Sequence, residues 1–498
     1  MTDTTYQIIA LVIYMAAMLF IGWYAYKKTV NLTDYMLGGR GLGAAVGALS
    51  AGAADMSGWL LMGLPGAIYV SGLVEVWIAI GLTIGAYLNW FFVAPRLRVY
   101  SFVTSDSITI PSFLENRLKD KSRLLRIVSG IIILIFFTFY VSSGMVAGGV
   151  FFESSFGLDY QLGLVIVSAV VVAYTLFGGF LAVSYTDFVQ GLMMFLALIA
   201  VPIIGVFVTG GFGQTAESIR SVDPTFLSLT AGASFIGVIS AVAWGLGYFG
   251  QPHIIVRFMA ISTLKEVRQA RRIGIGWMIL SLLGATATAL VGIAYFQQNP
   301  DMTLGDPEGV FIVLGQIFFH PLIAGFMLAA VLAAIMSTIS SQLIVTSSAL
   351  IEDLYKIAFK KASTDKQYVT LGRLAVLVIA LIAGFLAWER NDTILDLVAY
   401  AWAGFGAAFG PIILLSLFWR KLTTWGALAG MVVGAATVII WDSLDWEFAV
   451  NLYEIVPGFL LCLIAAVVVS LATFKPNAQI EEEFSETERL IREKPAKL

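Results

Sequence analysis

The chain has 498 residues, of which 59% are hydrophobic and 12% charged, with a formal net charge of −3. A soluble domain usually carries about 25% charged residues, so a water-soluble protein is excluded and an all-α polytopic membrane protein is predicted. The charge balance excludes a nucleic-acid binder. One cysteine, Cys462, excludes an intramolecular disulfide framework, and two histidines leave little for a histidine-rich metal site.

Thirteen stretches are apolar over the length that a bilayer-spanning helix needs, about 20 residues. Fewer helices combined with re-entrant loops are the alternative. The expected spans are 7–26, 43–70, 72–94, 124–153, 160–183, 187–211, 230–259, 273–296, 311–351, 370–388, 395–418, 424–441 and 454–474.

The basic residues predict the orientation. Of the 29 Lys and Arg, 27 fall in alternate connections, and only Arg220 and Arg390 fall in the others. Because Lys and Arg favour cytoplasmic loops, the N-terminus is expected outside and the C-terminus in the cytoplasm, with the protein in the cytoplasmic membrane. The first span is expected to be retained, since its positive charges follow it rather than precede it.

Two spans contain residues that do not suit a helix: the second at 51–59 (AGAADMSGW) and the seventh at 244–253 (WGLGYFGQPH). An interior Gly costs a helix ~1 kcal/mol and an interior Pro ~3 kcal/mol relative to Ala. Because five spans separate the two breaks, the broken helices run in opposite directions, which predicts a five-plus-five inverted repeat. The alternative is that these residues only allow close helix packing.

This repeat divides the chain into six parts. They are the first helix with its flanks (1–42), the first repeat (43–211), an external loop (212–229), the second repeat (230–418), two additional helices (419–474) and a cytoplasmic tail (475–498).

Two groups of side chains suit a cation. Asp55 lies near the middle of the second span, where a carboxylate needs a partner or a cavity. In the ninth span, Ala334, Ser337, Thr338 and Ser341 share one helical face. Carbonyls freed at the break and these hydroxyls are ligands for a hard cation. The alternatives are that backbone amides satisfy Asp55, and that the hydroxyls bond their own helix carbonyls.

Five stretches resemble the sodium/solute symporter family over nearly the whole chain, most closely its proline-transporting members. They are SAGAADMSGWLLMGLPGA (50–67), FGGFLAVSYTD (177–187), WGLGYFGQPHIIVRFMA (244–260), AAIMSTISSQL (333–343) and YAWAGFGAAFGP (400–411). The resemblance implies a LeuT-like fold and sodium-coupled import of L-proline by alternating access. Another small solute, such as another amino acid, a vitamin or an organic acid, is the alternative. The implied partners are the solute, the co-transported sodium ion and the lipid bilayer, with no obligate protein partner.

The resemblance also implies site residues. Sodium would be bound by carbonyls of Ala53, Met56 and Ala334 and hydroxyls of Ser337 and Thr338, with Asp55 as the required acid. The implied solute-binding residues are Ser57, Gly58, Trp59, Tyr140, Trp244, Tyr248 and Pro252. Any single aromatic among them is also explained by packing or by anchoring at the lipid interface. Ala54 departs from the pattern at low expected cost, because its neighbours would bind through the backbone.

Two further residues have competing interpretations. By its chemistry alone, Asp187 is expected as an N-cap at the start of the sixth span, whereas the resemblance implies a role in sodium release. Arg40 is expected as a cytoplasmic anchor, and by resemblance as a coupling residue. An enzyme is not expected, because no nucleophile or metal constellation stands out, and a channel is disfavoured because no repeated filter motif occurs.

Overall fold

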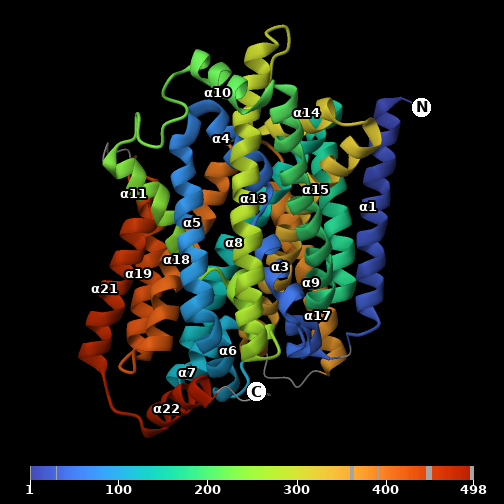
Figure 1. The fold of residues 1–498 in the computed structure, drawn as a ribbon. Helices are drawn as coiled ribbons and strands as arrows, with labels where there is room; N and C mark the ends of the chain where they lie inside the picture. Colours follow the sequence, from blue (N-terminus) through green and yellow to red (C-terminus); the bar gives the residue numbers. More distant parts are fainter. Residues whose placement is uncertain (1, 30, 359–363, 391, 445–450, 494–498) are drawn as a thin grey trace.

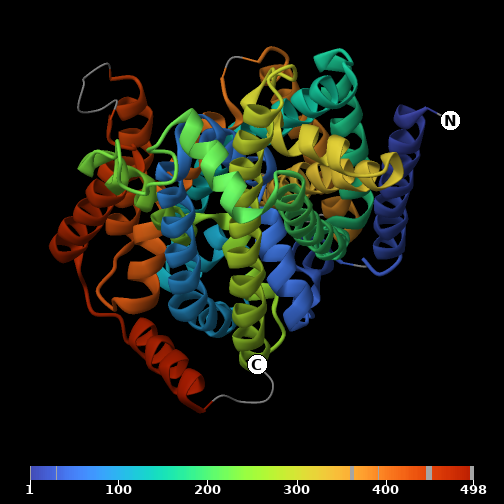
Figure 2. The same ribbon diagram turned by 45° about the horizontal axis from the view of Figure 1, so that its top comes forward.

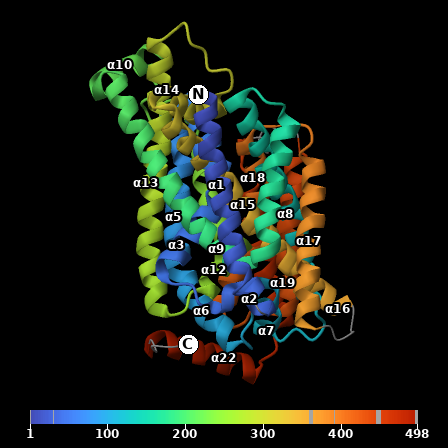
Figure 3. The ribbon, with the colours of Figure 1, turned by 90° about the vertical axis from the view of Figure 1, so that its right-hand side faces the viewer.

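The computed structural model describes residues 2–29, 31–358, 364–390, 392–444 and 451–493. In this part of the chain the regular structure is helical, apart from one bridge between Leu42 and Ile261. The helices form an upright bundle in which α1 begins at one end and α22 lies across the other (Figures 1 and 3). Ten described helical segments are long and apolar enough to cross a membrane.

The N-terminal half supplies one of the two broken helices and two long helical segments. The elements are α1 (Asp3–Tyr26), α2 (Leu32–Leu37), η1 (Gly38–Arg40), α3 (Ala44–Asp55), η2 (Trp59–Gly63), α4 (Leu64–Ser71), η3 (Gly72–Glu75), α5 (Val76–Leu88), η4 (Asn89–Val93), α6 (Ala94–Val103), α7 (Ile110–Leu118), α8 (Leu124–Phe156) and α9 (Tyr160–Val208).

The C-terminal half supplies the second broken helix and ends in a helix outside the bundle. The elements are α10 (Gly211–Val222), α11 (Phe235–Ala243), η5 (Trp244–Gly250), α12 (Pro252–Ala260), α13 (Leu264–Gln298), η6 (Pro307–Gly309), α14 (Val310–Phe318), α15 (Pro321–Ser348), η7 (Ala349–Tyr355), α16 (Lys356–Ala358), α17 (Asp365–Leu386), α18 (Ile394–Phe418), α19 (Thr424–Asp442), α21 (Ile455–Thr473) and α22 (Ala478–Glu493).

Burial separates the central helices from the peripheral ones. In their most apolar windows, 78% of the residues from α15 and 83% of those from α18 are buried, against 33% for α1 and α21. The exposed faces of the outer helices carry large apolar side chains such as Phe207 and Phe385, as a lipid-facing surface requires. α1 and the α19–α21 pair lie at opposite edges of the molecule (Figures 1 and 2).

Both predicted breaks are present. The first broken segment passes from α3 to α4 toward the end where α1 begins, and the second passes from α11 to α12 in the opposite direction (Figures 1 and 3). Their inner halves, α3 and α12, pack against one another and α3 also contacts α15. Close backbone contact holds the second break in place, because a Cβ on Gly85 of α5 would lie 2.1 Å from the carbonyl oxygen of Gly245.

Two expected boundaries are corrected. The spans expected at 160–183 and 187–211 are two helices within α9 that meet at Gly179 (φ 59°, ψ −154°), a backbone conformation open to Gly, so the break lies earlier in the chain than expected. The single span expected at 311–351 is two helices, because Pro321 begins α15 after His320 caps it. The tail 475–498 contains the helix α22.

Candidate ion and solute site

The first break frees two carbonyl groups. In an uninterrupted helix the carbonyl of Ala53 would accept the N–H of Ser57, but that N–H donates to Asp55 instead (2.9 Å). Likewise, the N–H of Leu60, four residues after Met56, donates to the carbonyl of Ser57 (3.1 Å). The backbone at Met56 (φ −78°, ψ 77°) has left the helical range. The carbonyls of Ala53 and Met56 therefore lack their helical donors inside the bundle.

The hydroxyl face of α15 meets this freed backbone. Ser337 donates from Oγ to the carbonyl of Ala53 at 2.7 Å, and Thr338 Oγ1 lies 3.4 Å from the same oxygen. Both hydroxyls also lie near the carbonyl of Ala334, at 3.1 and 3.3 Å. The hydroxyls thus bond their own helix, as the alternative had it, and also reach across to α3. Four of the five oxygen ligands that the resemblance implies lie together, fully or almost fully buried.

Asp55 is turned toward the second broken helix. Its carboxylate accepts a hydrogen bond from the hydroxyl of Tyr248 in η5, and its backbone carbonyl accepts one from the indole of Trp59 (3.4 Å). The other carboxylate oxygen is buried without a partner among the described residues. Asp55 also lines a cavity of about 20 Å³ beside Trp90 and Met278. The alternative, that backbone amides satisfy this carboxylate, is therefore not supported by its contacts in the described part of the chain.

Asp187 is a buried ion-pair residue and not an N-cap. It lies inside α9, fully buried, with Oδ2 2.7 Å from Ser50 Oγ of α3 and 3.2 Å from Nη2 of Arg257 in α12. Ser341, on the hydroxyl face of α15, lies 3.4 Å from the same oxygen. The N-cap expectation fails because the break between the two spans lies at Gly179, which leaves residue 187 inside a helix. Arg257, which had been counted with the cytoplasmic charges, is fully buried in this cluster.

Arg40 ties loops at the α22 end of the molecule. It pairs with Asp106 (2.8 Å) and donates to the carbonyls of Ser107 (2.6 Å) and Met259 (2.9 Å). None of these partners is a residue that surrounds Ala53. Arg40 therefore holds the end of α12 to the segment after α6, as an anchor would, and its role as a coupling residue stays a prediction.

An aromatic cluster lies beside the two breaks. The ring of Trp244 is 6.5 Å from that of Trp59 and 5.3 Å from that of Tyr453. Trp402 of α18 packs against Tyr248 (5.1 Å) and donates its indole N–H to the carbonyl of Trp244 (2.7 Å). Three of the seven implied solute residues, Trp59, Trp244 and Tyr248, are thus brought together. Trp402 was missed as a site residue, although it lies within the stretch 400–411 that carried the resemblance.

The other implied solute residues flank this cluster. Tyr140 of α8 is buried, its hydroxyl has no partner in the described part of the chain, and its ring lies 5.8 Å from that of His253. His253 follows Pro252, the first residue of α12. Ser57 accepts a hydrogen bond from the N–H of Trp59 (3.3 Å). A Cβ on Gly58 would lie 3.0 Å from the Cβ of Ala147 and 3.3 Å from Cγ1 of Ile335, so the packing around Gly58 is tight.

Comparison with known sequences gives consistent results. The sequence model of the family described as "Sodium:solute symporter family" matches residues 35–434. The chain is 63% identical over 469 residues to the high-affinity proline transporter PutP of Bacillus subtilis, covering 94% of this chain and 98% of that one. It is 53% identical over 499 residues to a sodium/proline symporter of Staphylococcus aureus, covering 98% and 97%.

Solved structures show a similar fold. A Na⁺-coupled sialic acid symporter in a substrate-bound, outward-open state matches with a TM-score of 0.80 at 21% identity, over 95% of this chain and 99% of that one. A nucleobase–cation symport transporter in a closed conformation matches with a TM-score of 0.56 at 14% identity, over 92% and 99%. At these identities the likeness concerns the fold alone.

Proposed function

The chain belongs to the sodium:solute symporter family, and from this premise we propose that it imports L-proline across the cell membrane by sodium-coupled alternating access. The observation that carries the proposal is the meeting of the freed Ala53 carbonyl with the hydroxyls of Ser337 and Thr338. A cluster of neutral oxygens inside an apolar bundle suits a cation of low charge that sheds its water.

In this proposal sodium binds to the carbonyls of Ala53, Met56 and Ala334 and to the hydroxyls of Ser337 and Thr338. Asp55 supplies negative charge nearby, without replacing a neutral ligand. The Asp187–Arg257 cluster lies on the continuation of the same face of α15, at Ser341. This position supports a role for Asp187 in the release of the ion.

Proline is a zwitterion with a small apolar ring, and the aromatic cluster suits it. The rings of Trp59, Trp244 and Tyr248 offer an apolar wall and π-faces for a secondary ammonium, an interaction of ~0.5–2 kcal/mol. The N–H group of Gly58 at the break is placed for a carboxylate. Tyr140 and Pro252 complete the wall from α8 and α12.

Sodium coupling supplies enough free energy for accumulation. One charge that crosses 100 mV releases ~2.3 kcal/mol, and a tenfold ion gradient adds ~1.4 kcal/mol. At one ion per solute, this sustains accumulation of several hundred-fold.

We place the N-terminus outside and the C-terminus in the cytoplasm, with thirteen crossings and a five-plus-five inverted repeat. The opposite directions of the two broken helices and the basic residues near α22 support this arrangement. α22 and the tail then lie in the cytoplasm.

Purified protein in liposomes tests the function. We expect labelled L-proline to accumulate when sodium is higher outside than inside, and to equilibrate when the gradient is removed with a sodium ionophore. A panel of other amino acids, organic acids and vitamins tests the solute at the same sodium gradient. Equal proline accumulation with and without the sodium gradient would contradict the coupling, and preferential uptake of another solute would contradict proline.

A further inference from the structure

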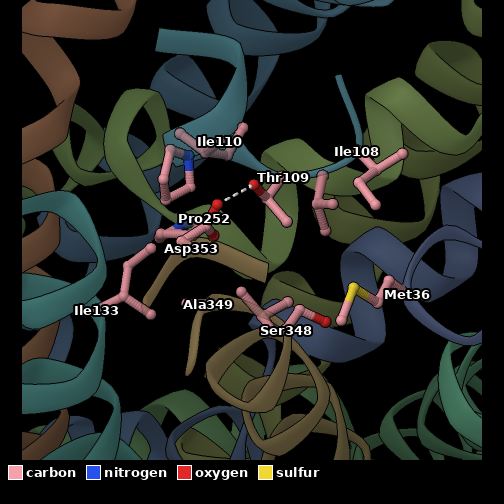
Figure 4. Close-up of a pocket in the computed structure, with 12 residues that line it drawn as sticks. Met36, Ile108, Thr109, Ile110, Ile133, Pro252, Ser348, Ala349 and Asp353 are labelled. Carbon is pink, nitrogen blue, oxygen red and sulfur yellow. Dashed lines mark hydrogen bonds between the residues drawn. The ribbon is translucent and has the colours of Figure 1, made fainter. Parts of the chain in front are cut away.

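A small cavity lies between the solute-site end of α12 and the end of the molecule that carries α22. Its volume is about 20 Å³, room for about one water molecule. The loop before α7 forms one wall, α8 and α12 form the second, and the end of α15 forms the third. Figure 4 shows Thr109 of the loop and Asp353 of η7 facing one another here, joined by a hydrogen bond of 2.9 Å.

Asp353 joins three segments that are distant in sequence. The same carboxylate oxygen that accepts the hydroxyl of Thr109 also accepts Nε of Arg126, at 2.9 Å. Arg126, at the start of α8, further contacts Glu115 of α7 (3.3 Å) and Glu352 (3.4 Å). Asp353 is fully buried, and its second oxygen has no partner in the described part of the chain. The carboxylate of Asp353 thus joins the loop and α8 to η7, and α7 is joined to the same cluster through the contact of Glu115 with Arg126.

The backbone at this point is a π-helical turn. Residues Ala349–Tyr355 continue α15 with the wider i→i+5 hydrogen bonding. Such turns interrupt the regular ladder and are frequent where a helix carries function. Both Glu352 and Asp353 of this turn contact Arg126.

The cavity continues the faces that line the solute site. Pro252 belongs to the cavity wall and to the proposed solute site. Ile133 lies seven residues before Tyr140, on the same face of α8. On α15, Val345 and Ser348 follow Ser341 at helical spacing, along the face that begins with the ion-site hydroxyls. A solute that left toward α22 along these faces would pass through this cavity.

We propose that the cavity is the closed inner part of the solute's exit route, and that the Thr109–Asp353–Arg126 cluster is the clasp that shuts it. The identity of the solute that leaves by this route rests on the proposed function. The carboxylate of Asp353 in η7 accepts hydrogen bonds from Thr109 in the loop 108–111 and from Arg126 in α8. Opening therefore requires that the loop separate from η7.

Cysteine accessibility tests the clasp without any solute. The only cysteine of the sequence is removed as Cys462→Ala, and Ser348→Cys places a reporter in the cavity wall. Inside-out vesicles are then treated with a membrane-impermeant maleimide. Adding Thr109→Val removes the hydrogen bond to the carboxylate and keeps the shape, and the labelling rate should rise about tenfold, the effect of losing one hydrogen bond to a charged group.

Two controls separate the clasp from local loosening of α7. Thr109 also caps α7 in a reciprocal pair with Ser112, so Thr109→Val removes a cap as well. Ser112→Ala removes the other half of that pair and leaves Asp353 untouched, and Thr109→Ser retains both bonds. We expect both control variants to label at the parent rate.

Two results would overturn the proposal: an unchanged rate in Thr109→Val, or an equal rise in Ser112→Ala. Proline uptake by the same proteins is measured separately. A failure of uptake to depend on proline or sodium overturns the proposed function, while the labelling rates still decide whether the clasp closes the cavity.

Discussion

At the scale of single residues, the site depends on backbone oxygens that lost their helical donors. The side chain of Ala53 has no polar group, but its backbone carbonyl accepts a hydrogen bond from Ser337 and so joins α3 to α15. The hydroxyls opposite are the groups that a substitution can remove.

Thr338→Ala removes one proposed sodium ligand while keeping the helix. We expect the apparent sodium affinity for proline uptake to fall about tenfold, because a lost ion ligand of ~1.4 kcal/mol changes affinity by that factor. The matched control is Thr346→Ala, whose hydroxyl is equally buried on α15 and bonds only its own helix at Gln342. The measurement is uptake against sodium concentration. An equal loss in the two variants would show that the effect is structural.

The buried pair of Asp187 and Arg257 predicts a non-additive pattern of stability. Removing one partner leaves an uncompensated buried charge, at a cost of ~3–5 kcal/mol. We expect Asp187→Asn and Arg257→Gln each to lower the thermal midpoint in detergent strongly, and the double variant to be more stable than the sum of the two predicts. Additive losses would mean that the two side chains do not compensate one another.

At the scale of elements, the molecule is fastened at its α22 end by an amphipathic helix. Phe484 of α22 is almost fully buried beneath Tyr100, with the guanidinium of Arg420 4.6 Å from its ring. Ion pairs join Lys119 to Glu483 (2.5 Å) and Arg420 to Glu481 (3.1 Å). Of these pairs Arg420–Glu481 is exposed and contributes little, so the burial of Phe484 is expected to be the larger contribution.

Phe484→Ala is therefore expected to release α22. Truncation of a buried Phe costs ~3–5 kcal/mol, which raises amide hydrogen exchange in residues 478–493 by well over tenfold. Glu482→Ala, on the exposed face of the same helix, is the matched control and should leave exchange unchanged. Equal protection in the two variants would place the stability of α22 in its ion pairs.

The elements also show what could be predicted from sequence. Both breaks were predictable, because Gly and Pro weaken a helix wherever they occur. Gly179 was not recognised as a bend, because the polar residues near Asp187 suggested a gap between two spans. Arg257 was assigned to a loop because charge distribution alone does not distinguish a cytoplasmic arginine from one paired inside the bundle. Trp402 needed the approach of α18 to η5, which involves residues about 150 positions apart.

At the scale of the whole molecule, the predicted bundle of membrane-spanning helices is confirmed, but the predicted number of helices is not. Ten described segments meet the length and hydropathy of a membrane span, and the thirteen crossings stay a prediction. The difference lies in pieces such as Tyr160–Leu176 and Phe235–Gly250, which are too short to be assigned by length. A bend or break divides an apolar stretch without changing its composition.

The contact between Gly85 and Gly245 has a consequence for motion. With no side chain between them, α5 and the second broken helix touch backbone to backbone. A Cβ on Gly85 would lie 2.1 Å from the carbonyl oxygen of Gly245, and a Cβ on Gly245 would lie 2.2 Å from the carbonyl oxygen of Gly81 in α5. Two segments in direct backbone contact cannot slide past one another unless they first separate. A conformational change that moves the second break must therefore move α5 with it, as one rigid unit of two helices.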